Sequence, residues 1–295
     1  MAESDSRSGT QSPDLHPVWK NRILRAKELA ERYASSRDVL TFYHDVLLFQ
    51  QDLYRFLSKE KTIIIETAAT APFSNAPLEI ALTQTANFST SFLKLIGRVG
   101  SEALSKIAGR LLADQKGGWA QLLQLYWEDQ LPNTDFKEGS WLFFPKVFLQ
   151  PCAEVLAHTY HRLVSDGDAD WQVSQGSTAC PFCRKAPQLA ILRTEGEGAS
   201  RWLQCCLCAT EWRHKRISCP ACGDENRSKH SYHKAPDFAH VRVEVCEACN
   251  HYIKGIDLTQ DGHAVPVVDE AATIPLDLWA VDQGYMKVEM NLIGM

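Results

Sequence analysis

The sequence predicts an α+β protein with an N-terminal all-α helical bundle, two tandem rubredoxin-like or zinc-ribbon-like four-cysteine metal modules, and a C-terminal helix. Three observations lead to this fold class. Apolar residues recur at helical spacing through the first half of the chain, whereas the apolar segments of the second half are only as long as strands. Four Cys-x-x-Cys pairs separate those short segments. This spacing lets one tight turn aim two sulfur atoms at a single metal ion.

Length and composition are those of an ordinary globular protein. The chain has 295 residues, roughly twice the usual length of one domain, so we expect more than one packed unit. Hydrophobic residues make up 45% and charged residues 23%, which argues against disorder, fibres and membrane barrels. No stretch approaches the roughly 18 uninterrupted apolar residues of a membrane-spanning helix. We therefore expect no integral association with a membrane.

The N-terminal region divides into a tail and a helical domain. Residues 1–15 are polar and lack apolar periodicity, which predicts a disordered tail, and residues 16–168 form the expected helical domain. Ser36 is placed to cap the first long helix. We expect each apolar stripe of these helices to be ordinary buried core. The stripes comprise Val39, Tyr43, Val46, Leu53 and Leu57; Phe92, Leu95 and Val99; Leu104, Ile107, Leu111 and Leu112; and Trp119, Leu122, Leu123, Tyr126 and Trp127.

Residues typical of loops mark the boundaries along the chain. Loops are predicted at residues 72–77 and 132–139, and a linker follows Val164. Beyond the linker we expect a first four-cysteine ribbon module over residues 169–218 and a second over residues 219–265.

The last segment, residues 266–295, is expected to contain a helix that packs back on the rest of the chain. Its helical stretch is predicted from Ala271 to Tyr285. Pro275 stands near the first turn of this helix and Gly284 near its end, which are the positions that these two residue types favour.

The cysteine pairs are the strongest chemical signal in the sequence. Two such pairs on neighbouring hairpins complete a tetrahedron of sulfur ligands, so eight paired cysteines predict two metal ions per chain. Redox-active or free thiols are the alternative, but unligated thiolates so close together would be exposed to oxidation. The paired cysteines are Cys180 and Cys183, Cys205 and Cys208, Cys219 and Cys222, and Cys246 and Cys249.

An internal repeat favours pairing in sequence order. Each half opens with Cys-Pro and closes with a plain Cys-x-x-Cys, and an arginine, Arg201 or Arg242, stands four residues before the closing pair. The first four cysteines would then share one ion and the last four the other. An interleaved arrangement, with the outer pairs on one ion and the inner pairs on the other, stays open.

The residue after each pair differs between the two predicted sites. Such turns need a left-handed backbone conformation there, so that amides can point at the sulfur atoms. Gly223 and Asn250 tolerate it in the second site, whereas Arg184 and Ala209 in the first site pay a steric cost. We therefore expect the first site to be the more strained.

The remaining cysteines and the nearby histidines are not expected to bind metal. Cys206 could replace Cys205, but the spacing of the other pairs favours Cys205, and Cys152 on an apolar stripe is expected to be a buried small hydrophobe. Because eight thiolates already fill two tetrahedra, we expect the histidines among them to lie at the surface. They are His214, His230, His233, His240 and His251.

Four protein ligands leave no open position for substrate, so we expect no metal-based hydrolysis and no enzyme. Four thiolates suit iron as well as zinc. The N-terminus lacks the apolar core of a signal peptide, which indicates the reducing cytoplasm, where structural disulfides are disfavoured.

The charge distribution argues against nucleic acid as a partner, despite the basic run from Arg213 to Arg216. The net charge is −5 and the isoelectric point is near 6.1. Residues 176–255 carry twelve basic and eight acidic side chains, and eight thiolates with two divalent ions would bring this region to about zero.

Longer blocks of sequence resemble the FdhE family of formate dehydrogenase accessory (formation) proteins. The resemblance rests on RWLQCCLCATEWRHKRISCPACG, on CEACNHYIKGID, and on the tail DEAATIPLDLWAVDQGYMKVEMNL. The N-terminal segments NRILRAKELAERYA and LLFQQDLYRFL are similar more weakly. Arg184 and Ala209 depart from the glycines usual in that family.

The resemblance implies a cytoplasmic maturation factor, or chaperone, for respiratory formate dehydrogenase. Such a protein binds the catalytic subunit before twin-arginine export and carries iron in rubredoxin-like sites, with zinc as the alternative. The eight paired cysteines match its metal ligands, and Thr210, Glu211, Trp212 and Arg216 match its signature. A rubredoxin-like electron-transfer protein is the second hypothesis, and a nucleic-acid-binding zinc ribbon is the third. No oligomeric state is predicted.

Overall fold

The computed structural model describes residues 16–59, 85–114, 117–131, 139–165, 177–292 and 294. The predicted tail at 1–15 and the predicted loop at 72–77 lie outside these residues, as do residues 132–138 and most of the predicted linker. Within the described part of the chain, no helix is both long and apolar enough to cross a bilayer.

The N-terminal half is helical, as predicted, and its core is aromatic. Phe92 contacts the rings of Phe49, Phe144 and Phe148 at centroid distances of 5.1 to 6.1 Å, and Trp119 packs edge-on against Phe148. Burying such large rings supplies much of the stability of a helical domain. The helices are α1 (His16–Arg32), α2 (Arg37–Lys59), α5 (Ala86–Val99), α6 (Glu102–Ala113), α7 (Gly118–Trp127) and α8 (Gly139–Ser165).

The C-terminal half is built on one mixed sheet, with strand order β3-β2-β1-β6-β5-β4 and β7 paired to β6. Strands β1 to β3 come from the predicted first module and β4 to β6 from the second, and each set is antiparallel within itself. The strands are β1 (Pro187–Glu195), β2 (Gly198–Cys205), β3 (Glu211–His214), β4 (His230–Lys234), β5 (Val241–Cys246), β6 (His251–Asp257) and β7 (Met286–Lys287).

A parallel pairing of β1 with β6 joins the two modules. Leu189 pairs with Lys254 and Leu192 with Asp257. The sequence predicts tandem modules but gives no sign that they share a sheet. Because both strands are buried, the joint forms part of the core.

Two C-terminal helices cover this sheet. Helix α10 (Ile274–Asp282) has Pro275 in its first turn and is followed by Gly284 with φ 86°, as the sequence predicts. Helix α9 (Pro266–Ala272) precedes it, and the two are separate helices with Thr273 between them. The prediction of one continuous helix from Ala271 to Tyr285 is therefore wrong at its start, because Ala271 belongs to α9 and α10 begins at Ile274.

A buried network of four charged side chains fixes α9 and α10 to the strands. Lys254 of β6 lies 3.0 Å from Glu270 and 2.5 Å from Asp277, and Lys287 of β7 contacts the same two carboxylates at 2.5 and 2.8 Å. Although burial opposes a positive charge, the carboxylates raise the pKa of Lys254. Two cations and two anions thus neutralise each other inside the fold.

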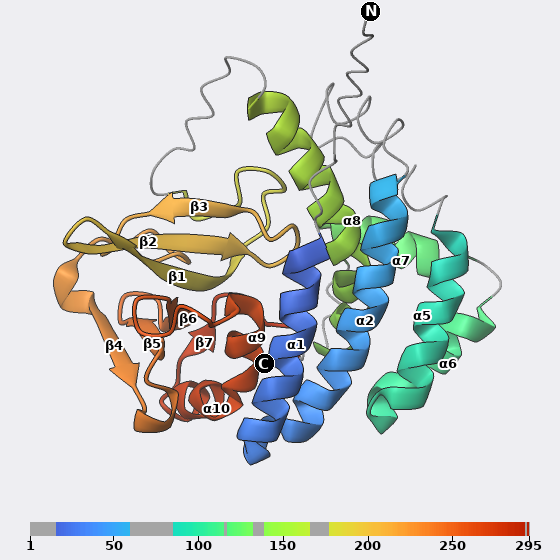
Figure 1. Cartoon of the computed structure of the whole chain (residues 1–295), viewed down its shortest axis with the longest axis horizontal. Helices are drawn as coiled ribbons and strands as arrows, with labels where there is room; N and C mark the ends of the chain where they lie inside the picture. Colours follow the sequence, from blue (N-terminus) through green and yellow to red (C-terminus); the bar gives the residue numbers. More distant parts are fainter. Residues whose placement is uncertain are drawn as a thin grey trace, which may run out of the picture.

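Helix α1 joins the two halves, because it packs against both α2 and α9 (Figure 1). Arg25 makes a bidentate pair with Asp269 of α9 at 2.6 and 3.0 Å, and Arg22 binds Glu154 of α8 at 2.8 Å. Ser36, expected to cap α2, directly precedes that helix, and its hydroxyl donates to the carbonyl of Ala272 at 2.6 Å. Polar side chains therefore hold the helical bundle to the sheet.

The buried pair of Arg22 and Glu154 gives a test of how α1 is held against α8 within the helical bundle. Glu154→Gln leaves a buried guanidinium without a counter-charge, which we expect to lower the free energy of unfolding by about 3 kcal/mol. Glu102→Gln, which removes the exposed partner of Lys106, should change it by less than about 0.5 kcal/mol. Urea unfolding followed by circular dichroism measures both, and equal effects would contradict the assigned role of Arg22.

Candidate metal centre

The first four cysteines meet at one end of the β1–β2 hairpin. Cys180 and Cys183 lie on the turn before β1, and Cys205 and Cys208 lie at the end of β2 and on the turn after it. The Sγ atoms of Cys180 and Cys208 are 3.5 Å apart, and those of Cys183 and Cys205 are 3.3 Å apart. We call this group site one.

The last four cysteines form the equivalent group in the second module. Cys219 and Cys222 precede β4, Cys246 ends β5, and Cys249 lies on the turn into β6. The Sγ atoms of Cys219 and Cys249 are 3.6 Å apart, and those of Cys222 and Cys246 are 3.9 Å apart. We call this group site two.

Both groups have the dimensions of a tetrahedral thiolate site. Metal–sulfur bonds of about 2.3 Å place the sulfur atoms of such a site about 3.8 Å apart. Within each group all four Sγ atoms lie within 4.8 Å of one another. The grouping follows sequence order, so the interleaved arrangement is not the one that the fold adopts. Cys205 rather than Cys206 belongs to site one.

The backbone of each turn points amides at the sulfur atoms. The amide of Leu207 donates to Cys205 Sγ at 3.4 Å, and the amides of Ala221 and Cys222 donate to Cys219 Sγ at 3.3 and 3.5 Å. Such bonds stabilise negative charge on sulfur. The arrangement therefore favours thiolates in both sites.

The residues after the four pairs all have a left-handed backbone, as the sequence predicts. Their φ angles are 63° at Arg184, 54° at Ala209, 76° at Gly223 and 55° at Asn250. Because an Arg or Ala side chain crowds the backbone in this conformation, site one contains two positions of steric strain. Gly223 is free of that strain and Asn250 tolerates the conformation better than most residues.

Burial makes the thiols of site one hard to ionise without a cation. It raises the pKa of Cys205 and of Cys208 well above the usual value, whereas hydrogen bonds from the neighbouring thiols lower the pKa of Cys180. Burial therefore opposes the ionisation of Cys205 and Cys208 when no cation is bound. A bound divalent or trivalent cation would allow all four to ionise.

The signature residues between the two sites support site one. The hydroxyl of Thr210 lies 3.1 Å from Cys208 Sγ, and Trp212, which is buried, donates from Nε1 to the carbonyl of Ser177 at 2.9 Å. Glu211 accepts a hydrogen bond from Gln204 and pairs with Arg193 at 2.6 Å. Sequence reasoning found no role for these residues; the contacts of Trp212 and Glu211 join segments far apart in the chain, whereas that of Thr210 is local.

Both segments that contain the cysteines match models of one known family. The FdhE central domain matches residues 179–216, and the FdhE C-terminal domain matches residues 217–293. Residues 179–293 of the chain match the FdhE family through these two models. The resemblance seen in the sequence is thereby confirmed.

Individual FdhE proteins agree with this assignment. An FdhE homolog of Aquifex aeolicus is 39% identical over 39% of this chain and 41% of its own length, so the chain spans about two fifths of that relative. An FdhE homolog of Cronobacter sakazakii is 24% identical over 99% of this chain and 94% of its own. The crystal structure of FdhE from Pseudomonas aeruginosa has the same fold, with a TM-score of 0.69 and 20% identity, and covers 93% of this chain and 94% of that one.

The two sites, both within the segment that matches FdhE, differ in exposure. In site one only Cys183 is partly accessible, whereas in site two Cys222 is exposed and Cys249 is half-buried. Site one packs against the helical bundle, since its cysteines belong to the main hydrophobic core. Site two therefore faces solvent and site one does not.

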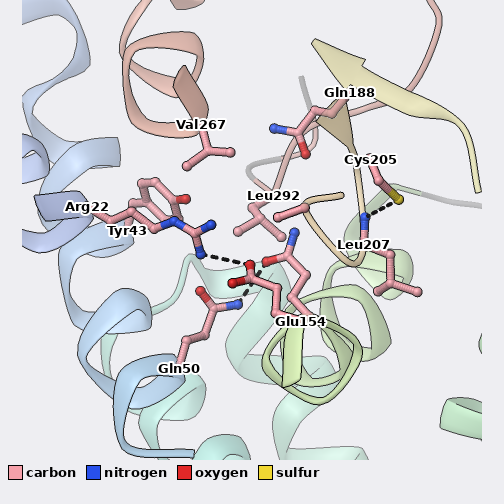
Figure 2. A pocket seen from close by; sticks show the side chains of 11 residues that line it. Arg22, Tyr43, Gln50, Glu154, Gln188, Cys205, Leu207, Val267 and Leu292 are labelled. Atoms are coloured by element: carbon pink, nitrogen blue, oxygen red, sulfur yellow. Dashed lines mark hydrogen bonds and ion pairs between the residues drawn. The ribbon is translucent and has the colours of Figure 1, made fainter. Parts of the chain in front are cut away.

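A chain of hydrogen bonds links site one to helices α2 and α8. Gln50 donates to Gln150, and Gln150 donates to the carbonyl of Cys206 at 2.8 Å. Figure 2 shows Gln50 and Glu154 facing the turn of Cys205 and Leu207 across a cavity of about 10 Å³, which has room for about one water molecule. The turn that positions two sulfur ligands is thus held by the helical domain.

Two of the five histidines are not surface groups, contrary to the prediction. His240 is buried and its Nε2 lies 2.8 Å from Asp269, and His214 is buried beside Arg201 across the β2–β3 pair. Burial, and then the positive charge of Arg201, lower the pKa of His214 to about 4, so it is neutral at pH 7. The prediction was based on the number of metal ligands, which does not determine whether a histidine packs in the core. Neither histidine belongs to the two sulfur clusters.

The two extra cysteines lie in the core. Cys152 and Cys206 are both buried, and burial raises the pKa of Cys152 to about 12. Cys152 is therefore the small buried hydrophobe that its position on an apolar stripe predicts.

The strain in site one can be relieved by substitution. Ala209→Gly removes the steric cost of φ 54°, and we expect it to raise the free energy of unfolding of the metal-loaded protein by about 1 kcal/mol. Ala221→Gly, at an exposed turn position with ordinary φ, is the control and should give no gain. Thermal unfolding compares them, and equal midpoints would show that Ala209 is not strained.

Proposed function

We propose that this protein is an accessory factor required to form active formate dehydrogenase. It binds the catalytic subunit of that enzyme in the cytoplasm, before the subunit is exported by the twin-arginine pathway. The match of residues 179–293 to the FdhE domain models supports this role, together with the sequence blocks that resemble formate dehydrogenase formation proteins.

The observation that carries the proposal is that two clusters of four cysteines lie on one sheet. Each cluster supplies four protein ligands, which leaves no position where a substrate could bind the metal. Such sites stabilise a fold and do not activate water. A protein whose metal chemistry is closed in this way is suited to holding a partner, so we propose no enzyme activity.

We propose two metal ions per chain, with iron in each site and zinc as the alternative. The ligands are the eight paired cysteines of sites one and two. Four thiolates fit either ion, and bound iron would supply one-electron redox chemistry that zinc lacks. What the chain itself provides is four sulfur atoms at each site, the donating amides and, at Cys208, the hydroxyl of Thr210.

Neighbouring cysteines of site one test the ligand assignment. Cys205→Ala removes a proposed ligand and should lower the metal content from two ions per chain to about one, with a loss of roughly 2 kcal/mol or more of stability. Cys206→Ala removes a sulfur just outside the cluster and should leave two ions bound. Elemental analysis of protein purified without air makes the comparison. Equal metal content in both variants refutes the assignment.

The function itself is tested in cells that lack this protein. We expect formate dehydrogenase activity to fall at least tenfold, to recover with the wild-type chain, and to recover far less with Cys205→Ala than with Cys206→Ala. Tagged wild-type protein should co-purify with the catalytic subunit before export. Normal enzyme activity without the protein would exclude the proposed role.

Electron transfer is the second candidate, and one observation favours it. The side chain of Cys222 is exposed, so site two offers a sulfur atom at the surface through which an electron could pass. Purified protein should then show visible absorption that bleaches on reduction. A colourless, zinc-filled protein that restores full formate dehydrogenase activity excludes this candidate.

A further inference from the structure

A cleft of about 690 Å³ lies beside site two, on the face of the sheet that α9 and α10 leave open. Along β5, Val241, Val243 and Val245 are buried in the small core that includes residues of α10, so Arg242 and Glu244 point to the opposite face. The chain from Arg216 to Pro220 forms another wall. The cleft is thus a concave surface between the two modules, and it borders site two, because Cys219 and Cys246 are among its lining residues.

Four arginines line this cleft and Glu244 is the one acidic residue among its lining side chains. Arg201 and Arg242, the two arginines of the internal repeat, both bind Glu244, at 2.7 and 2.5 Å. Arg201 is 2% exposed, and its Nε has no hydrogen-bond partner among the described residues. The floor of the cleft therefore keeps a net positive charge and an unused donor.

Arg216 and Arg227 complete the set at the rim. Both are exposed, and neither has an acidic partner within ion-pair distance in the part of the chain that the structure describes. Arg216 belongs to the signature segment for which the sequence suggests no role. Guanidinium groups in this position can each bind a carboxylate with two parallel hydrogen bonds.

The cleft also borders an edge strand. Among the described residues, strand β4 pairs with β5 alone, so the sheet does not use the backbone groups along the outer side of β4 (Figure 1). Three residues of β4 line the cleft, namely His230, Ser231 and Tyr232. The side chain of Tyr232 is 61% exposed, and that of Ile217 on the facing wall is 40% exposed. Backbone donors, apolar contacts and cations together suit an extended peptide.

We propose that this cleft binds an extended acidic segment of a partner protein, which adds beside β4 and places carboxylates on Arg216 and Arg227. The proposal rests on the proposed function where it takes that partner to be the client enzyme. Nucleic acid fits less well, because the metal-loaded modules have almost no net charge and the cleft offers only two unpaired arginines. The exposed apolar rim of Ile217 and Tyr232 likewise favours a peptide.

A synthetic peptide tests the chemistry directly. The probe is a fluorescein-labelled nonapeptide that alternates valine and glutamate, titrated with metal-loaded protein by fluorescence anisotropy. Arg216→Ala with Arg227→Ala should weaken binding at least tenfold, because two charge-assisted contacts are lost. Arg98→Ala with Arg110→Ala removes the same charge from exposed positions on α5 and α6 and should change binding less than twofold.

Each outcome decides the proposal. A tenfold loss in the cleft variant alone, with unchanged metal content and circular dichroism, supports it. Equal loss in both variants, or no binding of the peptide by wild-type protein, overturns it. Tighter binding of a labelled single-stranded oligonucleotide through the same two arginines also overturns it, in favour of nucleic acid.

Co-purification separates this proposal from the proposed function. If the wild-type chain captures the formate dehydrogenase catalytic subunit and the cleft variant does not, both stand. If both chains capture the subunit, the function stands and the cleft as its binding surface fails. If the wild-type chain captures none, the function fails, and the peptide titration alone decides whether the cleft binds acidic peptides.

Discussion

The C-terminal half depends on the electrostatic cost of gathering sulfur in a dry interior. Three of the four thiols of site one are buried, and burial opposes the charge that each would carry as a thiolate. A cation at the centre removes that cost and makes the arrangement favourable. The donating amides, the left-handed turns and the hydroxyl of Thr210 all serve the same end. Strands β1 and β2 are positioned by this cluster as much as they position it.

The sequence predicts those features of the structure that depend on residues close together in the chain. The helices, the four Cys-x-x-Cys pairs and the left-handed residues at Arg184 and Ala209 all follow from spacing within a few residues, and the structure places them as expected. Helix α10 was found for the same reason, because Pro275 and Gly284 mark its two ends. The interleaved alternative could be set aside only once the strands were placed.

The features that the sequence does not predict are contacts between residues far apart in the chain. No local pattern announces that β1 pairs in parallel with β6, or that His214 lies buried beside Arg201. No local pattern places Lys254 and Glu270 in the interior, yet they neutralise each other inside the fold. The repeated arginines were noticed as a mark of symmetry, but their shared partner Glu244 lies on only one of the two ribbons. Contacts between distant segments, not residue types, decide these cases.

The parallel joint between β1 and β6 also has a consequence for the order in which the chain can fold during synthesis. The first ribbon leaves the ribosome with the outer edge of β1 unpaired, and that edge is filled only after the whole second ribbon has been made. Helix α1 waits even longer for α9, whose Asp269 receives Arg25. During synthesis the unpaired edge of β1 is therefore open to aggregation until the last segments of the chain have been made. Early binding of metal by site one is one way to stabilise the β1–β2 hairpin over that interval.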